Sequence, residues 1–98
     1  MNKRIRLSPS AKKDFGNILE YLSENWDART VNNFIDIFQS NLKRIAFDPK
    51  QFMYFRKDLD IRKCIVTKHN TLYFKETEIA ILVIRIYDVR QKPSKLKF

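Results

Sequence analysis

This sequence contains little glycine, proline, cysteine or histidine. Its 98 residues include one Gly, three Pro, one Cys and one His. So few glycines and prolines exclude collagen-like, low-complexity and linker-rich chains. A single Cys excludes an intramolecular disulfide and a cysteine-based zinc site, and a single His excludes a metal centre built from several histidines. The lone Cys also suits a reducing compartment.

Long hydrophobic runs are also missing. The longest run, Ile79–Ile84, is far too short to span a membrane. The basic stretch at residues 1–6 is followed by no apolar segment of signal-peptide length. We therefore expect a cytoplasmic protein with a single domain over residues 1–98.

Apolar and aromatic residues are plentiful, and positive charge is concentrated in the second half. Apolar residues make up 44% of the chain, which is typical of a globular domain. The formal net charge is +9, with eight basic and six acidic residues in 1–49 but twelve and five in 50–98. A basic half favours a polyanionic partner, which can be nucleic acid, an enzyme that acts on nucleic acid, or an acidic protein. Solubility alone is the alternative explanation.

The first half of the chain has the pattern of a strand followed by two helices. Residues 3–7 alternate between polar and apolar, which predicts a short strand. Ser8 and the proline after it mark a helix start, with Ser8 as the N-cap. Apolar spacing predicts one helix that ends near Asn25 and a second that begins after Asp27 and stops at Pro49. The short link between them predicts an antiparallel hairpin.

From residue 50 onward the periodicity is that of β-strands. The candidate strands are residues 51–56, 61–68, 71–75 and 79–87, with tight turns at His69-Asn70 and at residues 76–78. Short connections make these strands antiparallel. The predicted fold is α+β, with an N-terminal strand and an antiparallel helical hairpin packed on one face of a twisted, mainly antiparallel sheet of about four strands.

Several side chains of the second half are candidates for binding or for RNA cleavage. Cleavage by attack of a 2′-hydroxyl needs a base, an acid and cationic stabilisation of the phosphorane. If the chain is an enzyme, the catalytic candidates are Arg62, Lys63, His69, Arg85, Tyr87 and Arg90. The candidates for binding a target or a nucleic acid are Arg62, Lys63, Lys68, Arg85, Arg90 and Lys92. Solvated strand faces and turns of ordinary proteins also carry such residues.

The sequence predicts neither a metal site nor a cofactor. Asp58 with Asp60, and Glu76 with Glu78, are more often local charge balance than metal ligands. Cys64 lies in the middle of a candidate strand and fits a small buried residue better than a nucleophile.

Four motifs follow one another over most of the chain. Residues 7–15 (LSPSAKKDF) are similar to the pattern L-S-x-x-A-x-x-D-L, and residues 18–26 (ILEYLSENW) to I-x-x-Y-x-x-x-x-W. Residues 61–73 are similar to a basic strand with its hairpin, and residues 81–96 to a last strand and tail. In this order the motifs resemble the RelE/ParE superfamily of toxins from bacterial type II toxin–antitoxin systems.

The first two motifs resemble the ParE branch in particular. That resemblance implies plasmid stabilisation, growth arrest by inhibition of DNA gyrase, and neutralisation by a cognate acidic antitoxin in a hetero-oligomer. The RelE branch instead implies a ribosome-dependent, metal-independent endoribonuclease of mRNA, to whose basic positions Lys63 and Arg90 correspond. Its return-strand Arg falls at Thr71 here, and no Tyr follows Arg90. A third possibility is a non-toxic relative that only binds its antitoxin.

Overall fold

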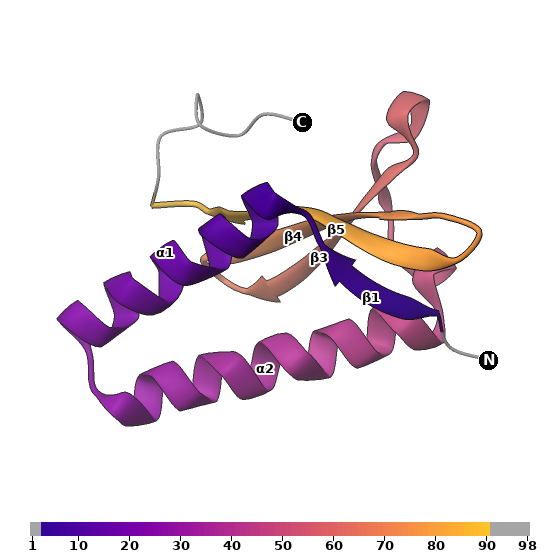
Figure 1. Ribbon diagram of the computed structural model, residues 1–98. Coiled ribbons are helices and arrows are strands. Elements are labelled where there is room, and N and C mark those ends of the chain that lie inside the picture. Colours follow the sequence, from indigo (N-terminus) through magenta and orange to yellow (C-terminus); the bar gives the residue numbers. More distant parts are fainter. Residues whose placement is uncertain (1–2, 91–98) are drawn as a thin grey trace.

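The computed structural model describes residues 3–90 (Figure 1). In chain order, its elements are β1 (Arg4–Leu7), α1 (Pro9–Asn25), α2 (Ala28–Phe47), the 3-10 turn η1 (Pro49–Gln51), β2 (Tyr54–Arg56), the 3-10 turn η2 (Lys57–Leu59), β3 (Ile61–Thr67), β4 (Asn70–Glu76) and β5 (Ala80–Asp88). Figure 1 shows α1 and α2 as a hairpin on one side of the sheet. Neither helix has the length and apolar character needed to cross a bilayer.

The sheet has five strands in the order β1-β5-β4-β3-β2. β1 runs parallel to β5, and the other neighbouring pairs are antiparallel. The predicted α+β fold with its helical hairpin is confirmed. The sheet holds five strands rather than about four because the short segments β1 and β2 both pair with it, one at each edge.

Both helices begin where the sequence predicts, because a polar side chain caps each of them. The Ser8 hydroxyl accepts a hydrogen bond from the backbone N–H of Ala11 at 3.0 Å. The Asp27 carboxylate accepts one from the backbone N–H of Thr30, also at 3.0 Å. α2 ends before Pro49, which has no N–H to continue the helical hydrogen bonds.

The hydrophobic core lies between the hairpin and the sheet. Its buried members are Ala11, Ile18, Leu22, Phe34, Phe38, Ile45, Cys64, Val66, Leu72, Phe74, Ile81, Val83 and Ile86. Leu72 and Phe74 are both fully buried, two positions apart on β4. Since successive side chains of a strand point to opposite faces, Tyr73 between them points away from the helices.

A buried ion pair joins α1 to β5. Asp14 is only 6% exposed. Its Oδ2 accepts hydrogen bonds from Nε of Arg85 at 2.8 Å and from the backbone N–H of Ile86 at 3.0 Å. Its Oδ1 accepts a further bond from Nη2 of Arg85 at 3.0 Å. The carboxylate is therefore paired in the way that a buried charge requires.

The turn between β3 and β4 lies one residue earlier than expected. Thr67 pairs with Asn70, so Lys68 and His69 form the turn and Asn70 already belongs to β4. The Thr67 hydroxyl donates to Oδ1 of Asn70 at 2.8 Å and accepts from the backbone N–H of His69 at 3.1 Å. These side-chain bonds close the turn without a left-handed residue at Asn70. Among the described residues other than glycine, positive φ occurs at Asp60, with φ 59°.

Truncating the core should be costly, whereas truncating the surface should not. Leu72→Ala removes a fully buried side chain and should lower the free energy of unfolding by about 2–5 kcal/mol, because it leaves a cavity. Ile79→Ala is the control, since Ile79 is 80% exposed, and should change stability by less than about 0.5 kcal/mol. Urea denaturation of both variants checks the expectation. Equal losses would contradict the described core.

Candidate functional site

The candidate site residues lie in three separate places. Lys63 lies on β3, and Arg85 and Tyr87 lie on β5, with β4 between the two strands. Lys68, His69 and Arg90 lie together at the end of the sheet nearest the α1–α2 link. Arg62 lies toward the outer edge of the sheet, beside β2. Lys92 lies outside the described residues.

Lys63 and Tyr87 share the face of the sheet that points away from the helices. Cys64 points to the helices and contacts α2, so its neighbour Lys63 points away from them. Lys63 lies opposite Tyr73, and Tyr73 lies opposite Arg85. Tyr87 is two positions further along β5. We name the surface formed by Lys63, Tyr73 and Tyr87 the sheet face.

Arg85 adjoins the sheet face, but its guanidinium is held by the buried carboxylate of Asp14. The Arg85 side chain is 16% exposed. The hydrogen bonds that Arg85 donates to the Asp14 carboxylate raise the pKa of Arg85 above its ordinary value. Arg85 is thus a permanent, fixed charge whose main partner is within the protein.

Two tyrosines give the sheet face an aromatic character. The ring of Tyr73 packs against that of Phe55, with centroids 4.6 Å apart. Burial and, to a lesser degree, the nearby Tyr87 raise the pKa of Tyr73. Tyr73 is only 6% exposed, so its ring is held in place by its neighbours on this face.

Arg62 does not join Lys63 on the sheet face, because adjacent residues of a strand point to opposite sides. Its Nη1 donates to the backbone carbonyl of Phe52 at 2.6 Å. Its guanidinium lies 4.0 Å from the centroid of the Tyr54 ring. Through these contacts, Arg62 stabilises the segment that leads into β2.

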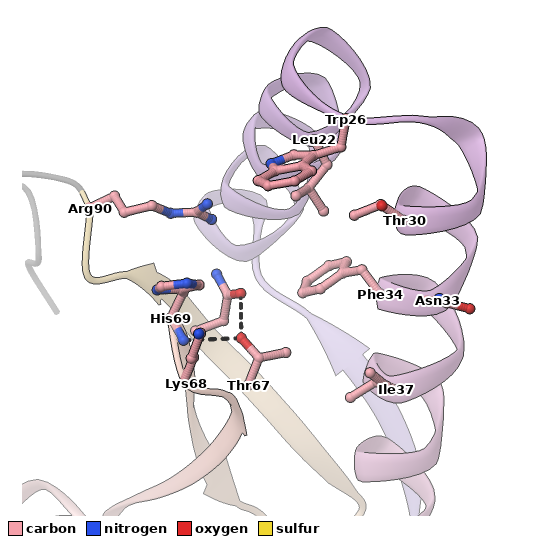
Figure 2. A pocket seen from close by; sticks show the side chains of 11 residues that line it. Leu22, Trp26, Thr30, Asn33, Phe34, Ile37, Thr67, Lys68, His69 and Arg90 are labelled. Atoms are coloured by element: carbon pink, nitrogen blue, oxygen red, sulfur yellow. Dashed lines mark hydrogen bonds between the residues drawn. The ribbon is translucent and has the colours of Figure 1, made fainter.

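Lys68, His69 and Arg90 line a pocket between the tip of the helical hairpin and the β3–β4 turn, which we name the hairpin pocket (Figure 2). Its volume is about 420 Å³. It is lined by Leu22, Trp26, Thr30, Asn33, Phe34, Ile37, Thr67, Lys68, His69, Asn70 and Arg90. Figure 2 shows Leu22 of α1 and Trp26, which directly follows α1, across from His69, with Phe34 and Ile37 of α2 forming another wall.

Two contacts hold the side chain of Arg90 beside this pocket. Its Nε donates to Oδ1 of Asp88 at 2.7 Å, and its guanidinium lies 4.2 Å from the centroid of the Tyr21 ring. Burial alone would raise the pKa of Asp88, but hydrogen bonds from the side chain and backbone of Arg90 outweigh it and leave that pKa below its ordinary value of 3.8.

The described residues 3–90 bring together no group of three or more His, Cys, Asp or Glu side chains that could hold a metal ion. Cys64 is buried, as the sequence predicts, and its thiol donates to Oδ1 of Asn41 at 3.4 Å. Burial raises the pKa of Cys64 to about 11, so the thiol is protonated at neutral pH.

Sequence reasoning did not single out Asp14, Tyr73 or Asn70. Asp14 did carry a signal, because it shares the apolar stripe of α1 with Ala11 and Ile18, and a carboxylate in that position needs a buried partner. The importance of Tyr73 and Asn70 arises from their cross-strand neighbours. No sequence pattern reveals these neighbours before the register is known.

The profile of one protein family matches nearly the whole chain. That family is described as the ParE toxin of the type II toxin–antitoxin system parDE, and the match covers residues 5–93. This chain belongs to the ParE toxin family. The resemblance that the motifs carried is thereby confirmed.

Solved structures agree with the fold of this ParE-family chain. It resembles a chain of the "Chromosomal ParDE TA system from P. aeruginosa" with a TM-score of 0.75 and 12% identity, over 89% of this chain and 96% of that one. It also resembles the "conserved hypothetical protein HP0894 from Helicobacter pylori" with a TM-score of 0.59 and 20% identity, over 93% of this chain and 98% of that one. A comparison with curated proteins gave no match.

The Asp88–Arg90 pair should make stability depend on acid pH. Because folding lowers the pKa of Asp88, its contribution is complete above about pH 4 and is lost as the pH falls through the folded value. Asp88→Asn should therefore cost about 1.5–3 kcal/mol of unfolding free energy at pH 7 and progressively less below pH 4. Urea unfolding across this range measures both effects. An Asp36→Asn control alters an exposed carboxylate of α2, and the same pH-dependent difference in that variant would refute the assignment.

Proposed function

We propose that this chain acts in the cytoplasm as a growth-arresting toxin that binds and inhibits DNA gyrase. Its membership of the ParE toxin family supports the toxin role. Its basic second half supports a target that itself handles a polyanion. In this proposal the sheet face, with Lys63, Tyr73 and Tyr87, contacts the target enzyme.

We favour inhibition over RNA cleavage because the three candidate arginines are already bound to partners within the protein. Arg85 is bound to Asp14, Arg90 to Asp88, and Arg62 to the carbonyl of Phe52. Cleavage of RNA needs several cations and a proton-transfer group around one phosphate.

The proton-transfer candidates are also divided between two places. His69 lines the hairpin pocket, whereas Tyr87 belongs to the sheet face. This separation supports an inhibitory binding protein more than a ribosome-dependent endoribonuclease.

The proposal includes neutralisation by an acidic antitoxin. A net charge of +9 attracts a partner of opposite charge and speeds its association. Exposed apolar side chains, among them Trp26 at 60% and Ile65 at 67%, give such a partner hydrophobic surface to cover. An antitoxin segment that folds as it binds would use both features.

Inducing the protein in bacteria should stop DNA synthesis before protein synthesis. Pulse labels of thymidine and leucine, taken minutes after induction, measure the two rates separately. Purified protein should also block supercoiling by gyrase in vitro. Lys63→Glu reverses a charge of the sheet face and should raise the concentration that half-inhibits supercoiling by about tenfold or more.

Lys43→Glu is the matched control, because it reverses an exposed charge on α2 outside the sheet face, and it should inhibit like the wild type. An earlier fall in leucine incorporation would replace gyrase by the ribosome as the target. If neither rate falls, the chain is a non-toxic relative and the proposal fails.

A further inference from the structure

The hairpin pocket has apolar walls that the described chain leaves partly uncovered. Its volume of about 420 Å³ is within the range of ligand-sized pockets, roughly 300–1,000 Å³. Trp26, directly after α1, and Ile37, on α2, are 60% and 42% exposed. Phe34 is buried beneath them (Figure 2). An apolar side chain that entered here would remove these surfaces from water.

The rim of the pocket carries basic side chains. Lys68 and His69 come from the β3–β4 turn, and Arg90 follows β5. None of the described residues that line the pocket is Asp or Glu. The guanidinium of Arg90 is held in place by Asp88 and Tyr21, so little freedom is lost when an anion binds beside it.

Asn70 adds a buried hydrogen-bond donor. It lines the pocket, is 3% exposed, and its Nδ2 makes no hydrogen bond of normal geometry with any described residue. Asp88 lies opposite Asn70 in the β4–β5 register, and its carboxylate is close enough for the Asn70 amide to help lower the pKa of Asp88. The geometry between the two groups nevertheless falls short of a hydrogen bond. A buried donor in this state favours an incoming acceptor, because leaving it unsatisfied destabilises the protein.

We infer that the hairpin pocket receives one apolar side chain of an acidic peptide segment, whose carboxylates meet Lys68 and Arg90 at the rim and whose backbone or side-chain oxygen accepts from Asn70. This inference deepens the proposed function and rests on it, since the segment would belong to the antitoxin. Charge complementarity selects an acidic partner. A nucleotide fits less well, because recognition of a base needs several polar groups along its edge and the pocket offers one unsatisfied buried donor.

Trp26 makes occupancy measurable, since it is the only tryptophan of the chain. The probe is a library of random peptides displayed on phage and selected on the full-length protein. The selected peptides should share an apolar residue flanked by Asp or Glu. As free peptides they should change the fluorescence of Trp26 on titration. Failure to enrich any peptide, or enrichment of peptides without acidic residues, would overturn the inference.

Two pairs of variants locate the binding. Thr30→Phe fills the pocket from α2, because the Thr30 side chain is directed into it (Figure 2), and its control Asn32→Phe adds the same side chain at an exposed position of α2 that does not line the pocket. Lys68→Glu reverses a charge of the rim, and its control is Lys43→Glu. Thr30→Phe and Lys68→Glu should weaken binding of the selected peptide by about tenfold or more, and the controls by less than about twofold.

Equal peptide affinity of Thr30→Phe and the wild type would overturn the pocket as the binding site. Displacement of the peptide by adenosine monophosphate at equal concentration would overturn the peptide as its ligand. The proposed function is judged separately, by gyrase inhibition. Thr30→Phe should still inhibit gyrase, because the pocket is separate from the sheet face.

Discussion

The structure depends on how the edge of β5 is completed after β1 ends. β1 pairs with β5 only as far as Leu7 and Val83. Beyond that point, the described residues that complete this edge come from the start of α1. The backbone N–H of Ser8 donates to the carbonyl of Val83, and the Ser8 hydroxyl donates to that of Ile84. The Asp14 carboxylate accepts from the backbone N–H of Ile86. One buried carboxylate thus satisfies an edge donor of the sheet and holds Arg85. A buried charge is tolerated only where its partners are fixed as well as this.

This attachment sets the geometry of both surfaces. It fixes the N-terminal half of α1 on β5, and the rigid helix carries Tyr21 and Trp26 to the opposite end of the sheet. There the tip of the hairpin meets the β3–β4 turn and forms the hairpin pocket. The same ion pair commits the guanidinium of Arg85, which leaves Lys63 and the two tyrosines as the characteristic groups of the sheet face. A substitution at Asp14 is therefore expected to disturb recognition as well as stability.

Local signals were enough to predict most of the fold. The capping residues Ser8 and Asp27 and the stop at Pro49 place both helices, and the change of period after residue 50 indicates the strands. The site was less predictable, because its composition depends on contacts between distant segments. Asp14 and Arg85 are 71 residues apart, and the face that Arg62 occupies follows from the strand register. The turn was misplaced by one residue because Thr67 bonds Asn70, a local interaction that competes with the usual turn preference of Asn.

Hydrogen exchange at the Ile86 amide is the most direct test of the claim that Asp14 completes the edge of β5. In the wild type, this amide should exchange as slowly as the amides paired between β4 and β5. In Asp14→Leu, which keeps an apolar side chain but no acceptor, the overall free energy of unfolding should fall by about 3–5 kcal/mol. The Ile86 amide should then lose more protection than its β4–β5 neighbours. Fast exchange of Ile86 in the wild type, or unchanged relative protection in Asp14→Leu, would contradict the account.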